Sequence, residues 1–122
     1  MAGEQILVVE DNERNMKLVR DVLGANGFRT LEATSGEHAI ELACEFEPAL
    51  VLMDVRLPGI DGVAALGRLR SDARTASIPV VALTAQAMRG DRERFIEAGF
   101  DGYLAKPVDI LELVAAVRAL CG

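Results

Sequence analysis

Apolar residues along this chain alternate between short continuous runs and longer stretches in which they have helical spacing. Gln5–Val9 is an apolar run of strand length, and the apolar positions that follow it recur as in an amphipathic helix. This predicted helix begins behind Asn12, a favourable N-cap, and ends at Asn26-Gly27, a favourable left-handed stop. The start of the chain therefore predicts one strand followed by one helix.

The same strand-then-helix unit recurs along the rest of the chain. The predicted strands are residues 5–9, 28–33, 49–53, 78–83 and 100–105, and the later helices are residues 35–45, 61–70, 86–98 and 109–120. Strict alternation favours a parallel sheet with helices on both faces, because right-handed crossovers place helices there. The third and fourth strands are continuously apolar like central strands, whereas the second mixes in polar residues like an edge strand.

We therefore expect an α/β fold with a five-stranded, doubly wound parallel sheet in the order 2-1-3-4-5, the flavodoxin-like arrangement. A chain of 122 residues fits one domain over residues 1–122 and is too short for a (βα)₈ barrel. The net charge of −6 argues against nucleic acid as a partner, since neutralising phosphates requires a basic face. The longest apolar runs are strand-sized, so we expect no association with a membrane.

The cysteines and the N-terminus bear on the cellular compartment. Cys44 and Cys121 lack CxxC spacing and lie in predicted helices, which indicates neither a zinc site nor a disulfide framework. The N-terminus has no basic stretch followed by an apolar core, so it does not have the pattern of a secretory signal. A cytoplasmic protein is the expectation.

Polar side chains follow the carboxyl ends of four predicted strands. Glu10 and Asp11 follow the first strand, Asp54 the third, Thr84 the fourth and Lys106 the fifth. In open parallel sheets this edge carries the ligand site, at the crevice where the strand order reverses. With the order 2-1-3-4-5, the first and third strands are neighbours at that crevice, so Asp11 should lie beside Asp54.

Carboxylates that converge without an equal number of cations repel one another, and a hard divalent cation is the natural counter-ion. Oxygen ligands favour Mg²⁺, with Asp11 and Asp54 as direct ligands and Glu10 holding a water molecule. The Thr84 hydroxyl and the Lys106 ammonium would then face a transferred phosphoryl group, whose oxygens need donors and positive charge.

Each of these residues also has an ordinary structural interpretation when it is taken alone. The acidic residues before Asn12 fit a helix cap, Asp54 a turn, Thr84 a helix start, and Lys106-Pro107 a loop. Their joint occurrence at the ends of the correct strands favours the functional interpretation.

The motifs identify the chain by resemblance as a response-regulator receiver domain along nearly its whole length. The motifs that carry this resemblance are VVEDN at residues 8–12, LMDVRLPGIDG at 52–62, PVVALTA at 79–85 and KP at 106–107. They resemble the acidic pocket, the phosphoacceptor loop, the switch strand and the lysine-proline turn of that family. Segments 12–19 and 85–91 are further similar to single-domain members that regulate cell division.

The resemblance implies a role for each site residue. Asp54 would accept a phosphoryl group from a histidine kinase or a histidine phosphotransferase, while Glu10, Asp11 and the backbone carbonyl of Arg56 hold Mg²⁺. Lys106 would contact the phosphate, and the resemblance also implies a cis peptide bond between Lys106 and Pro107. Such a protein is no enzyme beyond its own phosphorylation and dephosphorylation.

The resemblance also implies how the signal leaves the domain. Thr84 would be the switch hydroxyl and Tyr103 the paired aromatic switch, which together remodel the surface of the fourth helix, fifth strand and last helix. A half-buried strand tyrosine without a switching role is the alternative for Tyr103. We expect no effector domain after Gly122, and therefore a downstream protein effector.

Two further surfaces are candidates for protein contacts. The outer edge of the first helix is expected to present Met16 beside Lys17 and Arg20, a docking spot for the phosphodonor; ordinary solvated surface is the alternative. The last helix should bury an apolar stripe that includes Ile110. Its small outer residues would suit a partner or a second copy; scattered exposed alanines without a role are the alternative. A monomer or a weak dimer is expected.

Two other functions compete with the phosphoacceptor role. An aspartyl-phosphate hydrolase of the haloacid-dehalogenase type would carry a DxDx pattern after the first strand, where this chain has Glu10-Asp11-Asn12-Glu13. A pseudo-receiver that acts as a constitutive binding module would normally lack a pocket residue, and none is missing from this sequence.

Overall fold

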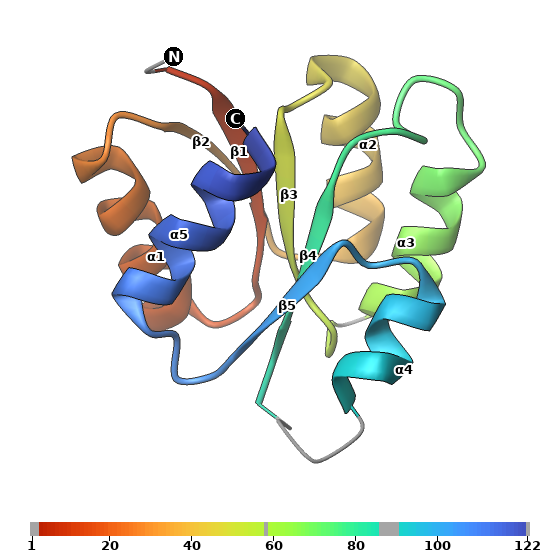
Figure 1. The fold of residues 1–122 in the computed structure, drawn as a ribbon. Coiled ribbons are helices and arrows are strands. Elements are labelled where there is room, and N and C mark those ends of the chain that lie inside the picture. Colours follow the sequence, from red (N-terminus) through yellow and green to blue (C-terminus); the bar gives the residue numbers. More distant parts are fainter. Residues whose placement is uncertain (1–2, 58, 86–90, 122) are drawn as a thin grey trace.

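A five-stranded parallel sheet in the order β2-β1-β3-β4-β5 forms the centre of the computed structural model, which describes residues 3–57, 59–85 and 91–121 (Figure 1). The strands are β1 (Gln5–Val9), β2 (Arg29–Ala33), β3 (Leu50–Asp54), β4 (Val80–Thr84) and β5 (Gly102–Ala105). The helices are α1 (Glu13–Ala25), α2 (Gly36–Phe46), α3 (Gly62–Arg70), α4 (Asp91–Ala98) and α5 (Ile110–Cys121). The fold class and the strand order expected from the sequence are confirmed.

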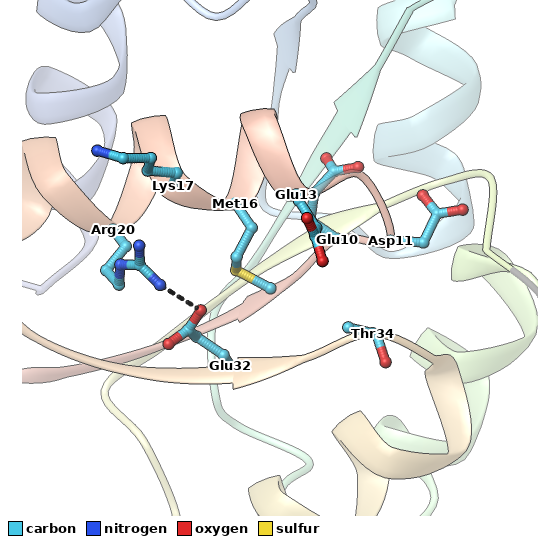
Figure 2. Close-up of a pocket in the computed structure, with 8 residues that line it drawn as sticks. All are labelled: Glu10, Asp11, Glu13, Met16, Lys17, Arg20, Glu32 and Thr34. Carbon is cyan, nitrogen blue, oxygen red and sulfur yellow. Dashed lines mark hydrogen bonds and ion pairs between the residues drawn. The ribbon is translucent and has the colours of Figure 1, made fainter.

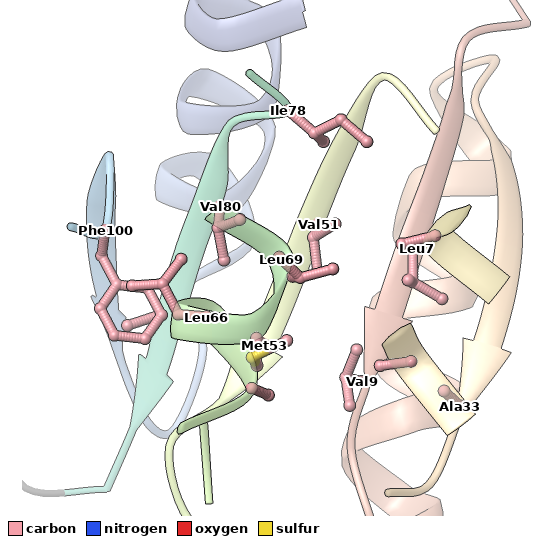
Figure 3. Packing of buried hydrophobic residues seen from close by; sticks show 14 of the residues in the cluster. Leu7, Val9, Ala33, Val51, Met53, Leu66, Leu69, Ile78, Val80 and Phe100 are labelled. Atoms are coloured by element: carbon pink, nitrogen blue, oxygen red, sulfur yellow. The ribbon is translucent and has the colours of Figure 1, made fainter. Parts of the chain in front are cut away.

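The helices cover both faces of the sheet, with α1 and α5 on one face and α2, α3 and α4 on the other (Figure 1). Successive side chains of β3 point to opposite faces, so this strand contributes to both cores. Val51 and Met53 pack with Leu69 of α3 in the cluster of Figure 3, while Leu50 and Leu52 face α1 and α5. All five residues of β3 are buried, as expected for a central strand.

Helix caps fix where two loops of the site end. The side chain of Asn12 accepts hydrogen bonds from the backbone N–H groups of Arg14 and Asn15. Helix α1 therefore begins at Glu13, just past Glu10 and Asp11. Asp61 caps α3 in the same way by accepting from the N–H of Ala64. These caps end the β1–α1 loop and the β3–α3 loop at defined positions.

Two helices differ from their predicted form. The sequence places the start of the fourth helix at residue 86, but residues 86–90 lie outside the described part of the chain, within which α4 begins at Asp91. In α5 the buried residues include Leu113 and Val117, as predicted, whereas Ile110 is 49% exposed. The expectation that Ile110 faces inward is therefore wrong: the helix begins at this residue, and the buried positions of α5 start one turn later at Leu113.

Candidate functional site

The carboxyl ends of the strands meet at one edge of the sheet, and the candidate residues follow them. β1 and β3 are neighbours with Val9 opposite Met53, so the residues that come after these two positions lie close together. On the other side of β3, Asp54 lies opposite Leu83 of β4. The strand order reverses between β1 and β3, which is where ligands bind in open α/β sheets.

Three carboxylates converge at this reversal point. Glu10, Asp11 and Asp54 each offer an oxygen, and these atoms all lie within 4.8 Å of one another. Glu10 is 1% exposed and Asp54 is 5% exposed, whereas the side chain of Asp11 is open to solvent. The Oε1 atom of Glu10 accepts a hydrogen bond from the backbone N–H of Asn12 at 3.2 Å, which holds this buried carboxylate in place. The juxtaposition that the sequence predicts is present.

Lys106 brings one positive charge to the three carboxylates. Its Nζ atom lies 2.6 Å from Glu10 Oε2 and 2.7 Å from Asp54 Oδ2. The backbone N–H of Lys106 donates to the carbonyl of Thr84 at 2.7 Å, and the peptide bond to Pro107 is cis, as expected. The lysine side chain is 14% exposed, so this ion pair is largely shielded from water.

Burial and pairing shift the pKa values in this cluster. Burial raises the pKa of Glu10, and the nearby Asp54 carboxylate raises it further, while the hydrogen bond from Lys106 opposes both effects. Burial alone would lower the pKa of Lys106, but its hydrogen bonds to Asp54 and Glu10 raise it above the ordinary value. The lysine is therefore held in its charged form.

The loop after β3 is folded tightly against Asp54. The Oδ1 atom of Asp54 accepts from the backbone N–H of Arg56 at 2.9 Å, and the N–H of Gly62 donates to the carbonyl of Val55 at 2.9 Å. A Cβ atom at Gly62 would lie 2.6 Å from the carbonyl oxygen of Asp54, so the start of α3 needs glycine here. The sequence alone suggests only a turn residue at this position.

A cavity of about 300 Å³ opens over these side chains. Its lining includes Asp11, Asp54, Arg56, Thr84 and Lys106. Thr84 is buried at the end of β4, the strand after which the sequence places it. The donor set of clustered carboxylate oxygens is the kind that Mg²⁺ prefers, so these residues fit a magnesium ion.

Tyr103 lies in β5 and is half-buried. Its ring centroid is 6.1 Å from that of Phe95 on α4, with the planes tilted by 42°. Phe95 in turn makes an edge contact with Phe100, with centroids 5.9 Å apart. The sequence singles out Tyr103 but not these phenylalanines, because only the packing of α4 on β5 brings the rings together.

Met16 is buried in the core, not exposed on the outer edge of α1 as expected from the sequence. The expectation that it forms an exposed apolar spot is wrong, because it is 6% exposed and packs in the core with Ile6 and Val8. The helix buries Met16, Val19 and Leu23, and this phase turns Lys17 and Arg20 toward solvent.

Lys17 and Arg20 line a second cavity of about 360 Å³ together with Met16, Glu32 and Thr34 (Figure 2). Arg20 pairs with Glu32 at 3.0 Å, as the dashed line in Figure 2 shows, and Lys17 pairs with Asp21 at 2.6 Å. The positive charge expected along this edge of α1 is therefore largely balanced by acidic neighbours.

Comparison with known proteins identifies the class. Residues 6–118 match the response regulator receiver domain, so the chain belongs to this family of two-component signalling domains. The chain is 40% identical to the polar-differentiation response regulator DivK of Brucella ovis, over 98% of this chain and 97% of the relative. The resemblance to the receiver family that the sequence predicts is therefore confirmed along nearly the whole chain.

Solved structures agree in fold. A putative response regulator from Chloroflexus aurantiacus superposes with a TM-score of 0.92 and 34% identity, covering 98% of each chain. The receiver domain of the sensor histidine kinase PA1611 from Pseudomonas aeruginosa has a TM-score of 0.91 and 37% identity over 99% of each chain. That structure contains a magnesium ion coordinated in the active site cleft. Across residues 3–57, 59–85 and 91–121 of the present chain, no helix is long and apolar enough to cross a membrane.

Proposed function

We propose that this receiver domain is a phosphoacceptor in which Asp54 takes a phosphoryl group from a histidine kinase or a histidine phosphotransferase. The observation that carries the proposal is the cluster around Asp54, where Lys106 Nζ lies 2.7 Å from Oδ2 and two further carboxylates lie within 4.8 Å. An isolated structural ion pair needs one carboxylate, whereas this lysine contacts two and a third lies beside them. Such an excess of negative charge beside a cavity suits a site for Mg²⁺ and phosphate.

The residues that would hold Mg²⁺ are Asp11, Asp54 and the backbone carbonyl of Arg56, with Glu10 acting through a water molecule. When bound, the ion supplies positive charge to the oxygens of the phosphoryl group. This assignment is supported by the carboxylate cluster and by the position of Arg56 on the cavity wall. Glu10 is the most buried of the three acids, which suits a ligand that acts from the floor of the site.

The reaction itself requires little from the protein beyond positioning and charge. A carboxylate oxygen of Asp54 forms a bond to phosphorus as the P–N bond of the phosphohistidine donor breaks, and the donor imidazole leaves with the electron pair. Lys106 already contacts Oδ2 and would neutralise the acyl phosphate that forms. Asp54 Oδ1 is held by the Arg56 N–H, which fixes the orientation of the carboxylate.

We further propose that phosphorylation changes the surface of α4, β5 and α5. The added charge and acceptor oxygens would draw the Thr84 hydroxyl toward the phosphate, and Tyr103 would respond. The ring contact between Tyr103 and Phe95 supports this proposal, because it links β5 directly to α4. A downstream protein effector would read this surface.

The phosphodonor would dock over α1, near the mouth of the cavity. Lys17 and Arg20 are exposed there, and Met16 takes no part because it is buried. The apolar contribution comes instead from the first turn of α5, where Leu111 is 80% exposed and follows Lys106 by five residues in the chain. An exposed apolar side chain that follows the site lysine so closely in the sequence suits a partner helix that delivers phosphohistidine.

The test is phosphorylation with phosphoramidate in the presence of Mg²⁺, followed by intact mass. The wild-type protein should gain one phosphoryl group that hydroxylamine removes, and Asp54→Asn should gain none. Asp61→Asn is the matched control, because asparagine can still cap α3 and the reaction should proceed as in the wild type.

The alternatives predict other outcomes of the same experiment. Unmodified wild-type protein would favour a pseudo-receiver, and rapid release of phosphate over many turnovers would favour a hydrolase. Modification of Asp54→Asn at the wild-type rate would contradict the assignment of Asp54.

A further inference from the structure

The first turn of α2 reaches across to the loop that follows Asp54. Glu37 extends its carboxylate to this loop, and its Oε1 atom accepts a hydrogen bond from the backbone N–H of Ile60 at 3.1 Å. A Cβ atom built on Gly59 would lie 2.7 Å from the same oxygen, so the carboxylate lies directly against the loop backbone. Gly59 has a positive φ of 76°, a conformation that exposes the following N–H to this acceptor and that favours glycine.

The backbone of α2 approaches the same point. A Cβ atom at Gly36 would lie 2.7 Å from Cγ1 of Ile60 and 3.0 Å from its carbonyl oxygen. Ile60 also packs against the core cluster on this face of the sheet. The outer part of the loop is therefore anchored to α2 twice, by side-chain packing at Ile60 and by the hydrogen bond to Glu37.

The inner part of the loop is anchored to the site itself. The N–H of Arg56 donates to Asp54 Oδ1, and the N–H of Gly62 donates to the carbonyl of Val55, which closes the base of the loop. Arg56 lies between the base and the point held by Glu37. A shift of the outer loop would therefore move the carbonyl of Arg56, the atom that would hold Mg²⁺ beside Asp54.

We propose that Glu37 is a positioning residue for the phosphorylation site: its contact with Ile60 holds the β3–α3 loop so that the Arg56 carbonyl is in place to bind Mg²⁺. This inference rests on the proposed function. Glu37 lies in a helix that the site does not otherwise use, and it touches neither the phosphoacceptor nor the carboxylate cluster. Its own backbone N–H and that of Ile60 lower the pKa of its carboxyl group, so at neutral pH it is an ionised acceptor.

The experiment compares Glu37→Ala and Glu37→Gln with the wild type. Glutamine keeps an oxygen that can accept from Ile60 but removes the charge, so it separates the hydrogen bond from a general attraction of negative charge for Mg²⁺. Glu41→Ala is the matched control, because it removes an exposed glutamate one turn further along α2. Mg²⁺ affinity is measured by calorimetry, and exchange of the Ile60 amide hydrogen by NMR.

We expect Glu37→Ala to bind Mg²⁺ about two- to tenfold more weakly, the effect of losing one hydrogen bond on a positioned ligand. The Ile60 amide should exchange faster in this variant, while amides in the centre of β3 keep their wild-type rates. Glu37→Gln should stay near the wild type in both measurements, and Glu41→Ala should be unchanged.

Two results would overturn the inference. Mg²⁺ affinity and Ile60 exchange in Glu37→Ala that match the wild type would show that the contact positions nothing. A Glu37→Gln variant as weak as Glu37→Ala would show that charge, not the hydrogen bond, is responsible. Failure of the proposed function is distinguishable from both, because it would be seen as absent phosphorylation of the wild-type Asp54.

Discussion

The ammonium of Lys106 lies 2.7 Å from Oδ2 of Asp54, although 52 residues separate the two along the chain. The same nitrogen also pairs with buried Glu10, so one cation balances two shielded carboxylates. Under the proposed function, the stability of the protein and the chemistry of the site therefore depend on the same side chain.

Lys106→Met should lower the free energy of unfolding at pH 7 by about 2–4 kcal/mol, because removing one partner of a shielded ion pair leaves the others uncompensated. The pKa of Lys106 is raised in the folded protein, so its contribution is fully present below its ordinary pKa of 10.5 and is lost as pH rises through the folded value. The difference between wild type and variant should therefore shrink above pH 10.5. Urea unfolding from pH 7 to 11 measures it.

Lys17→Met is the control for this prediction. Lys17 pairs with Asp21 on the surface of α1, with side-chain exposures of 68% and 54%, so its removal should change stability little at any pH. A Lys106→Met variant as stable as Lys17→Met at pH 7 would contradict the interpretation of the buried cluster.

Asp11→Asn should weaken Mg²⁺ binding by about one to two orders of magnitude, since it removes the negative charge of a direct ligand, an attraction of roughly 1–4 kcal/mol in a partly solvated site. Without metal, the same variant should be at least as stable as the wild type, because it removes repulsion among three carboxylates. Calorimetric titration and urea unfolding test the two parts. Glu13→Gln, a neutralised carboxylate outside the cluster, should retain Mg²⁺ affinity, and equal weakening in both variants would refute direct ligation by Asp11.

Gly62→Ala should destabilise the protein by about 1–3 kcal/mol and slow phosphorylation, because the new methyl group overlaps the backbone of Asp54 and Val55. Gly67→Ala in the same helix is the matched control, because a methyl group there would meet no described atom within 4 Å beyond its own stretch of helix. Helix propensity should make that variant more stable by about 0.5–1 kcal/mol. Thermal unfolding and the phosphoramidate reaction provide the readouts, and equal behaviour of the two variants would contradict the steric argument.

Arg70→Ala should lower stability by about 2 kcal/mol, because the guanidinium joins two loops through several hydrogen bonds. Arg70 donates to the carbonyls of Ala76, Ile78 and Gly99, and it lies 2.8 Å from Asp101 Oδ2. Arg70→Lys should recover only part of the loss, since one ammonium does not reproduce the planar fork.

Arg68→Ala, on the exposed side of the same helix, should have little effect and serves as the control. The midpoint of urea unfolding checks all three variants. Full recovery in Arg70→Lys would mean that charge alone accounts for the contribution of Arg70.

The sequence determined the order of strands and helices because these depend on local patterns. Apolar runs such as Leu50–Met53 mark central strands, and the side chains of Asn12 and Asp61 mark helix starts by accepting from N–H groups two or three positions ahead. Right-handed crossovers then leave few ways to arrange a repeated strand-helix unit. Placing Asp11, Asp54 and Lys106 at one edge follows from that topology.

The tertiary structure decided which side of each helix faces inward and which loops touch. Successive helix positions differ by about 100° around the axis, so a small error in the predicted phase places a buried residue on the outer face, as happened with Met16 in α1. Ile110 is 49% exposed at the first residue of α5, and burial begins one turn later at Leu113. The contact of Glu37 with Ile60 spans 23 residues and involves a backbone N–H, which every residue except proline carries. The sequence therefore does not show which N–H group Glu37 will meet. The approach of α2 to the β3–α3 loop makes Ile60 the partner.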